Sequence, residues 1–232
     1  MTPILVLPPL GGPGLLQDFL TALEPAARGR VVELPVELGQ APSTETIARR
    51  VLGDWPTQLP RPVAVFGISL GSMVAQWIAA RAPERVSHLV LASTTARPLD
   101  HPSGALRAAG LARCLLAPRD EAHACLVDGV LSESSTAPRR SADASAPRRR
   151  DLLWWAAAAA AHDARAQLES IGAPTTVLSG ADDRLIPPSA QADVAAAIAG
   201  AEHHVLEGCG HDLTLEAPSR AAAAVRRAVG LG

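Results

Sequence analysis

The fold is decided by the stretch VAVFGISLGS, residues 63–72. The apolar, β-branched run 63–66 predicts a buried strand, and a helical pattern begins near Ser72. Between them lies Gly67-Ile68-Ser69-Leu70-Gly71. A sharp strand-to-helix turn of this kind strains its central residue, and glycines two positions before and after keep neighbouring backbone clear of it. Ser69 would then project above the edge of a sheet, which makes it a candidate nucleophile.

Short apolar runs alternate with helical stretches on both sides of this turn. Strands are expected at residues 4–7, 31–34, 63–66, 86–92, 175–178 and 204–206. Helices are expected around residues 15–23, 44–58, 72–82, 189–199 and 217–229. This alternation predicts an α/β fold with a mostly parallel sheet of about six strands and helices on both faces.

The alternation fails between residues 97 and 170. This segment has helix-like stretches around 105–116 and 152–168, joined by a Ser/Pro/Arg-rich passage at 132–150. The sequence therefore predicts one α/β core from residues 1–96 and 171–232, with 97–170 inserted as a helical lid. The passage contains Arg139, Arg140, Arg148, Arg149 and Arg150. These arginines form either a docking surface for an anionic substrate tail or a solvated loop, as charge runs usually do.

Composition excludes several kinds of chemistry. The 232 residues have a formal charge of −2 and contain neither lysine nor tyrosine. A lysine Schiff base, a P-loop lysine and a phenolic acid or base are thus ruled out. The near-neutral charge argues against nucleic-acid binding. Residues 4–7 are too short for a signal peptide or a membrane span. Cys114, Cys125 and Cys209 are odd in number and lack metal-site spacing, which predicts reduced thiols in a cytoplasmic protein and no structural disulfide.

A serine hydroxyl needs a histidine to take its proton and a carboxylate to orient that histidine. Both residue types follow expected strands. Asp182 and Asp183 come after the strand at 175–178, and His211 comes after the strand at 204–206. The order Ser, Asp, His matches that of one fold built around such a turn.

These blocks resemble the α/β-hydrolase superfamily, and in particular its esterase and 3-oxoadipate enol-lactonase-like branch. The similarity is carried by Gly67–Gln76, Ala82–Val86, Leu89–Ala92, Gly180–Pro188 and Gly208–Pro218. It covers about two thirds of the chain and omits the lid. The resemblance implies Ser69 as nucleophile, Asp183 as acid and His211 as base, with Asp182 as a turn residue.

Two backbone N–H groups should form an oxyanion hole. The resemblance places one at Leu70, directly after the nucleophile, and the other in the loop after the first strand. Many relatives have His-Gly where this chain has Pro8-Pro9, and because proline cannot donate, Leu10 is the expected donor. Most relatives also precede that first strand with an antiparallel hairpin, which is missing here. The sheet edge left open favours a homodimer or a covering element.

The remaining tryptophans, cysteine and histidines are weaker candidates for functional residues. Trp154 and Trp155 either line the substrate pocket or anchor the lid helix to the core. Cys209 is interpreted as a small apolar filler and not as a nucleophile. His203 and His204 begin a strand and are interpreted as structural. His101, His123 and His162 lack ligand spacing, so no metal is expected, and no other cofactor is called for.

The sequence thus predicts a serine hydrolase that cleaves a small or medium carboxylic ester or lactone. The small-molecule substrate would form an acyl-enzyme on Ser69. Alternatives are a thioesterase for carrier-bound acyl chains and a cyclase or lyase that uses the same scaffold for C–C bond chemistry. A binding protein without catalysis is disfavoured, since such a protein does not need Ser69, Asp183 and His211 together.

Overall fold

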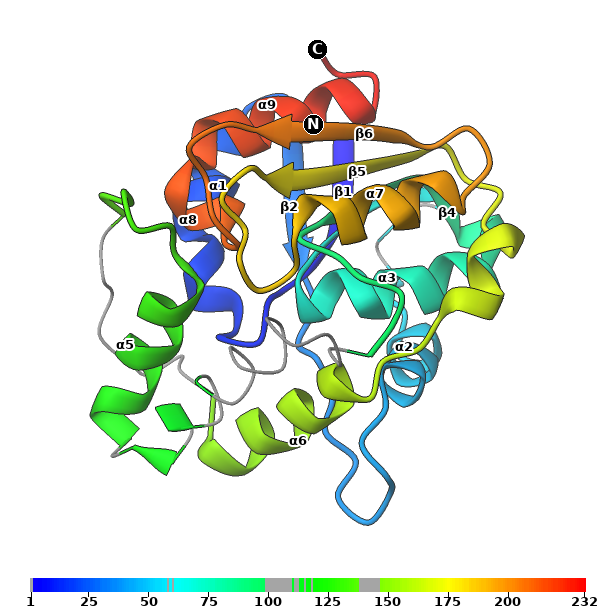
Figure 1. Cartoon of the computed structure of the whole chain (residues 1–232). Helices are drawn as coiled ribbons and strands as arrows, with labels where there is room; N and C mark the ends of the chain where they lie inside the picture. The colour runs from blue at the N-terminus through cyan, green and yellow to red at the C-terminus, as the bar shows by residue number, and fades with distance from the viewer. Residues whose placement is uncertain are drawn as a thin grey trace.

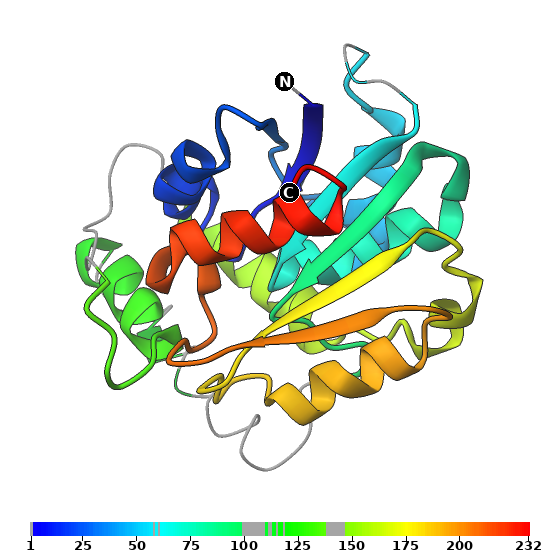
Figure 2. The same cartoon turned by 90° about the horizontal axis from the view of Figure 1, so that it is seen from above.

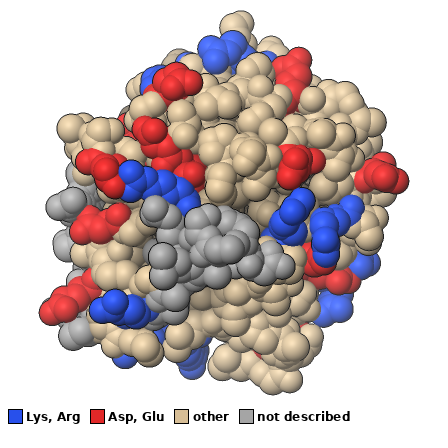
Figure 3. All heavy atoms as spheres, viewed as in Figure 1, with Lys and Arg blue, Asp and Glu red and all other residues tan. Residues whose placement is uncertain are grey.

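The computed structural model describes residues 2–57, 59, 61–98, 110, 113–114, 116–117, 119–137 and 147–232. The predicted helix around 105–116 and the residues Arg139 and Arg140 lie largely or wholly outside these ranges. No helix of the described part is long and apolar enough to cross a membrane. On the face shown in Figure 3, acidic and basic side chains are interspersed among uncharged ones, in keeping with the small net charge.

Six parallel strands form one sheet in the order β2-β1-β3-β4-β5-β6 (Figure 1). The strands are β1 Thr2–Leu7, β2 Ala27–Val31, β3 Val63–Ile68, β4 Val86–Ala92, β5 Thr175–Gly180 and β6 Glu202–Leu206. The prediction of a parallel sheet of about six strands is confirmed. Figure 2 shows how the strands fan out from β1 to β6 as the sheet twists.

Helices cover both faces of the sheet. They are α1 Gln17–Leu23, α2 Thr44–Gly53, α3 Leu70–Arg81, α5 Arg119–Val130, α6 Arg149–Ala160, α7 Pro188–Ala196, α8 Leu213–Glu216 and α9 Pro218–Ala228. Short 3-10 turns are η1 Pro13–Leu16, η2 Pro83–Arg85 and η3 Arg165–Ser170.

The side chains of β1 show why two layers of helices are needed. Leu5 and Leu7 point into a core with α2, α3 and α7, whereas Ile4 and Val6 point into a second core with α1, α8 and α9. Alternate residues of a strand face opposite sides of the sheet, and here both sides are apolar. The sheet is therefore buried on both faces, with its strand ends left to form a site.

The strand order reverses direction between β1 and β3. From β1 the chain moves to the edge strand β2, and from β3 it moves the other way through β4, β5 and β6. Ligands of open α/β sheets bind beyond the carboxyl ends of the strands at such a switch point. The loop after β1 and the turn after β3 meet there.

The segment between β4 and β5 contains α5, α6 and η3, and no strand among its described residues. Figure 1 shows α5 on the side toward which the arrowheads of β5 and β6 point. Helix α6 packs against α2 and α3.

The prediction of unpaired thiols is wrong for two of the three cysteines. Cys114 and Cys125 form a disulfide with their Cα atoms 5.3 Å apart. They are 11 positions apart in the sequence, and nothing in this spacing indicated that the two thiols would meet. Both pack in a small apolar cluster with Leu126 and Leu152. Cys209 is free and buried, as expected of an apolar filler.

Candidate active site

Ser69 stands in a strained turn at the end of β3. Its φ of 51° and ψ of −119° lie in a region that non-glycine residues rarely adopt. Its N–H donates to the Ala92 carbonyl at 2.9 Å, and its own carbonyl accepts from Ser72 Oγ at 2.6 Å. The strain that the sequence predicted is present, and bonds on both sides of Ser69 maintain it.

Two glycines make this turn sterically feasible. A Cβ on Gly67 would lie 2.5 Å from the Gly71 carbonyl oxygen, and a Cβ on Gly71 would lie 2.1 Å from that of Leu7. Both contacts are with backbone, which cannot move aside cheaply. The turn therefore packs against its own helix and against the end of β1 only because neither position has a side chain.

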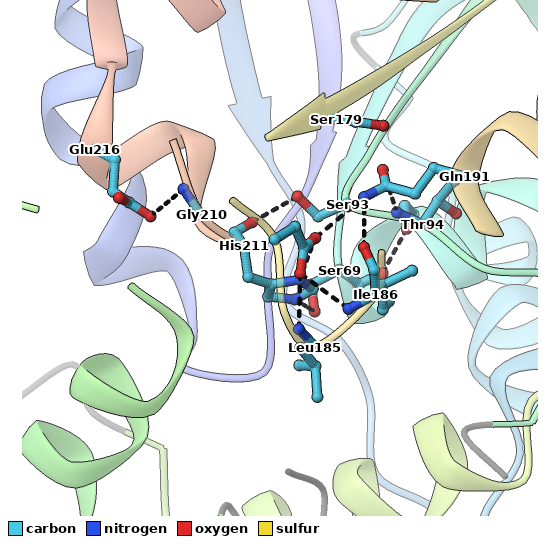
Figure 4. Close-up of polar contacts among 12 residues, drawn as sticks. Ser69, Ser93, Thr94, Ser179, Leu185, Ile186, Gln191, Gly210, His211 and Glu216 are labelled. Atoms are coloured by element: carbon cyan, nitrogen blue, oxygen red, sulfur yellow. Dashed lines mark hydrogen bonds and ion pairs between the residues drawn. The ribbon is translucent and has the colours of Figure 1, made fainter. Parts of the chain in front are cut away.

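Ser69, His211 and Asp183 come together although they are far apart in the sequence, and Figure 4 shows Ser69 beside His211. His211 Nε2 lies 2.8 Å from Ser69 Oγ, and His211 Nδ1 lies 2.9 Å from Asp183 Oδ2. His211 and Asp183 are both buried. In this arrangement a histidine can accept the proton of the hydroxyl while the carboxylate fixes its orientation.

The carboxylate of Asp183 accepts hydrogen bonds at both oxygens. Oδ1 accepts from the N–H groups of Leu185 and Ile186 at 3.0 and 2.9 Å. Oδ2 accepts from Gln191 Nε2 at 3.1 Å and faces His211. Asp182, by contrast, is exposed. Of the two neighbouring aspartates, only Asp183 is placed to orient the histidine.

Opposing effects act on the pKa of His211. Burial lowers it, but the nearby carboxylate of Asp183 raises it, with smaller contributions from Asp212 and Glu216, and the net direction is upward. Asp212 is buried directly beside His211, and this burial raises the pKa of Asp212. Its side chain caps α8 by accepting from the N–H groups of Thr214 and Leu215, which lowers the pKa by less than burial raises it. His211 is therefore surrounded by acidic groups whose charge favours its protonated form, as a proton-accepting base requires.

Sequence reasoning missed three residues that hold the histidine and its acid. Gln191 donates to Asp183, and its Oε1 accepts from Thr94 N–H at 3.2 Å. Ser93 Oγ donates to the His211 carbonyl. Glu216 accepts from Gly210 N–H at 2.9 Å. Ser93 directly follows β4, whereas Gln191 lies on α7 and Glu216 on α8, inside the block Gly208–Pro218 but with no role predicted for it.

An apolar cavity of about 50 Å³ opens in front of Ser69. Its described lining comprises Pro9, Leu10, Gly11, Leu15, Ser69, Leu126, Val127, Val130, Leu185, His211 and Asp212. Leu10 thus lies at the cavity, and Leu70 begins α3 directly after Ser69. A larger cavity of about 450 Å³ also includes Pro9 in its lining and extends to Arg150 and Trp155. Both cavities are lined by Pro9 of the loop after β1.

The tryptophans occupy different places. Trp154 packs into the main core and is not among the described residues that line the small cavity. Trp155 Nε1 donates to the Pro35 carbonyl at 3.3 Å, and its ring lines the larger cavity.

The other histidines expected to be structural make contacts elsewhere. His203 Nε2 lies 2.6 Å from Ser179 Oγ, and His204 pairs with Glu202.

Burial raises the pKa of Cys209, which disfavours a reactive thiolate.

A parallel sheet in this order, with a strained serine turn at the switch point, defines an α/β-hydrolase. Comparisons with known proteins agree: residues 44–218 match the family described as serine aminopeptidase, S33, and the chain belongs to that family. It is an α/β-hydrolase enzyme. No curated protein sequence matches it significantly.

Solved structures resemble it over nearly its whole length. A hydrolase from Pseudomonas aeruginosa is 28% identical, with a TM-score of 0.78 over 99% of this chain and 90% of that one. A thermophilic esterase from Thermogutta terrifontis is 21% identical, with a TM-score of 0.74 and the same coverage. A non-heme bromoperoxidase from Mycobacterium tuberculosis is 20% identical, with a TM-score of 0.72 over 100% of this chain and 93% of that one. The likeness of the last two is one of fold.

Proposed function

We propose that this hydrolase cleaves a small or medium carboxylic ester or lactone through an acyl-enzyme on Ser69. The observation that carries the proposal is the line of short contacts from Ser69 Oγ through His211 to Asp183. In the first step Ser69 Oγ attacks the carbonyl carbon while His211 Nε2 takes the hydroxyl proton. His211 then gives that proton to the leaving oxygen, and Asp183 keeps the ring oriented throughout.

The negative charge that develops on the carbonyl oxygen needs donors in place beforehand. The N–H groups of Leu70 and Leu10 are proposed for this role. Leu70 is the first residue of the twelve-residue helix α3, so its amide lies at the positive end of a helix dipole. Water, activated by His211, would then attack the acyl carbon and release the acid.

The size of the cavities supports a small acyl group. The cavity in front of Ser69 measures only about 50 Å³ and its lining is mainly aliphatic, which favours a short acyl chain. The cavity of about 450 Å³ next to it offers room for the alcohol part of the ester. We further propose that residues 97–170 act as a lid, since α5 of this segment contributes Leu126, Val127 and Val130 to the small cavity.

The test compares two serines that each contact a histidine. Ser69→Ala should abolish both hydrolysis of short p-nitrophenyl esters and labelling by a fluorophosphonate. Ser179→Ala, which removes the contact between Ser179 Oγ and the ring of His203, should preserve both. Undiminished ester hydrolysis by folded Ser69→Ala would refute the acyl-enzyme. If the protein hydrolyses a carrier-bound thioester but no free ester, the substrate class is thioesters. If the fluorophosphonate does not label Ser69, C–C bond chemistry is favoured.

A further inference from the structure

The segment that follows α5 is fastened to the loop that carries His211. The His211 N–H donates to the Val130 carbonyl at 3.0 Å. Glu216 bridges the same two segments: its Oε1 accepts from Gly210 N–H at 2.9 Å, while its Oε2 accepts from Ser132 N–H at 3.1 Å and Ser132 Oγ at 2.6 Å. Figure 4 shows Glu216 reaching Gly210, the residue before His211. Four hydrogen bonds therefore meet at this junction.

Gly210 allows the two segments to approach this closely. A Cβ at this position would lie 2.6 Å from the Ser132 amide nitrogen and 3.0 Å from the Leu131 carbonyl carbon. It would also lie 2.8 Å from Glu216 Oε1. The histidine loop and the lid segment are thus in direct backbone contact, with no space for a side chain between them.

Apolar side chains continue the contact on the inner side. Val127 of α5 packs with Leu215 of α8 and with Leu15, and all three are buried. Val127 and Leu15 also line the cavity in front of Ser69. The junction therefore connects the cavity wall to the residue proposed to be the base.

We propose that Glu216 is a positioning residue that couples the lid wall of the acyl cavity to His211. The inference rests on the proposed function and extends it: the α5 edge of the lid is a fixed wall and not a flap, and the carboxylate of Glu216 is what fixes it. Each carboxylate oxygen serves a different side of the junction, so a shorter or neutral side chain cannot replace both sets of bonds. Charge-assisted hydrogen bonds of this kind are stronger than neutral ones.

The charge of Glu216 also reaches His211. The acidic groups near this histidine are Asp183 after β5, Asp212 on its own loop and Glu216 on α8, and all three raise its pKa against the effect of burial. His211 must be neutral to accept the Ser69 proton, so the acid limb of a kcat/KM profile reports its pKa. Removing the Glu216 charge lowers that pKa, which moves the acid limb to lower pH.

The experiment measures kcat/KM for a short-chain ester from pH 4 to 9 by pH-stat. Glu216→Ala is expected to lower the plateau roughly tenfold to hundredfold, the scale of loss when a reacting group is displaced by about 1 Å. Glu216→Gln keeps one carbonyl acceptor, so its plateau should lie between those of Glu216→Ala and the wild type. Both variants should shift the acid limb to lower pH. Glu207→Gln, with the same charge change at an exposed position of the same loop, should behave as the wild type.

A second route reaches the junction from the lid side. Ser132→Ala removes one bond to Glu216 but leaves the carboxylate, so the plateau should fall without movement of the acid limb. Added to Glu216→Ala it should cause no further loss, because the two residues act through one contact. Ser132→Ala alone tests the coupling even where Glu216→Ala fails to fold.

The outcomes separate this inference from the proposed function. A wild-type protein whose Ser69 is not labelled by fluorophosphonate contradicts the proposed function itself. A labelled, active wild type whose folded Glu216→Gln variant keeps both the plateau and the acid limb overturns the role of Glu216. A purely structural Glu216 would lower the melting temperature and leave the acid limb in place.

Discussion

His162 gives the clearest prediction about stability. It is 1% exposed, and its Nδ1 lies 2.8 Å from Thr44 Oγ1 while its Nε2 lies 3.4 Å from Gln76 Oε1. Burial lowers its pKa from 6.5 to about 4, against smaller opposing effects of a hydrogen bond with the Thr95 backbone and the charge of Asp163. The folded protein therefore keeps His162 neutral at pH values where the unfolded chain binds a proton.

The magnitude follows from linkage between protonation and folding. A difference of about 2.5 pKa units corresponds to about 3 kcal/mol, at about 1.4 kcal/mol per unit. Since the folded pKa is the lower one, this stability is fully present above pH 6.5 and is lost as the pH falls from 6.5 to about 4. About 2 kcal/mol of it should be gone by pH 5.

The assay is urea unfolding of the wild type and His162→Gln between pH 7.5 and 5. The variant is expected to be less stable at pH 7.5, because it loses buried hydrogen bonds, and to lose about 2 kcal/mol less than the wild type on acidification. His204→Gln, at an exposed histidine, should retain the wild-type pH dependence. If His162→Gln and the wild type lose equal free energy between pH 7.5 and 5, the assignment of this acid sensitivity to His162 is wrong.

Two further predictions concern the turn and the cavity. Gly71→Ala places a Cβ 2.1 Å from the Leu7 carbonyl oxygen and should lower the free energy of unfolding by about 3 kcal/mol or more. Gly53→Ala, with open space around it, should be neutral or stabilising. Equal melting temperatures for both variants would contradict the steric argument. Leu126→Ala enlarges the acyl cavity and should shift the preferred p-nitrophenyl ester to a longer acyl chain. Leu152→Ala, in the same apolar cluster but outside the described cavity lining, should lower stability without that shift. If Leu126→Ala prefers the same acyl chain length as the wild type, the α5 side of the cavity does not set acyl size.

Strands that are buried on both faces were predicted more accurately than strands at the sheet edge. The inner strands β3 and β4 are nearly continuous apolar runs, and their predicted positions at 63–66 and 86–92 fall on Val63–Ile68 and Val86–Ala92. The edge strand β2 was predicted at 31–34 but lies at Ala27–Val31, where the sequence is ARGRV. An edge strand can pair through its backbone and leave arginines in solvent, so its apolar content does not mark it.

The segment 97–170, which we propose to be a lid, was predicted less completely than the core. Its inserted position between β4 and β5 was visible as a loss of strand signal, yet helix α5 was not predicted. The α5 sequence RDEAHACLVDGV mixes apolar and charged residues without a strong helical stripe. Such a helix is stabilised by what it packs against, here the loop of His211 and the residues Leu10 and Leu15 that follow β1. These are tertiary contacts that no local pattern records.

Ser69, Asp183 and His211, the residues we propose to react, could be chosen from the sequence because the glycine turn and the strand ends mark their positions. The residues that position them were not, since Gln191 and Glu216 act through contacts across the fold. Their side chains reach these partners only because distant chain segments come close together. That close approach depends on glycines, which have no side chain in the way. Gly180 is an example: a Cβ there would lie 2.1 Å from the Gly210 carbonyl oxygen, so the end of β5 also touches the His211 loop.

The two sides of the site therefore differ in how freely they can change. On the sheet side, Asp183 already accepts from Leu185, Ile186 and Gln191 and faces His211, so a substitution there leaves a buried donor or acceptor unpaired. On the lid side, the cavity is lined by aliphatic residues of α5 whose shape can change at the cost of packing alone. If Glu216 fixes α5 to the histidine loop, such changes alter the substrate range while the junction keeps His211 in place. Substrate selection can then vary through Leu126 and Val127 without rebuilding the reacting groups.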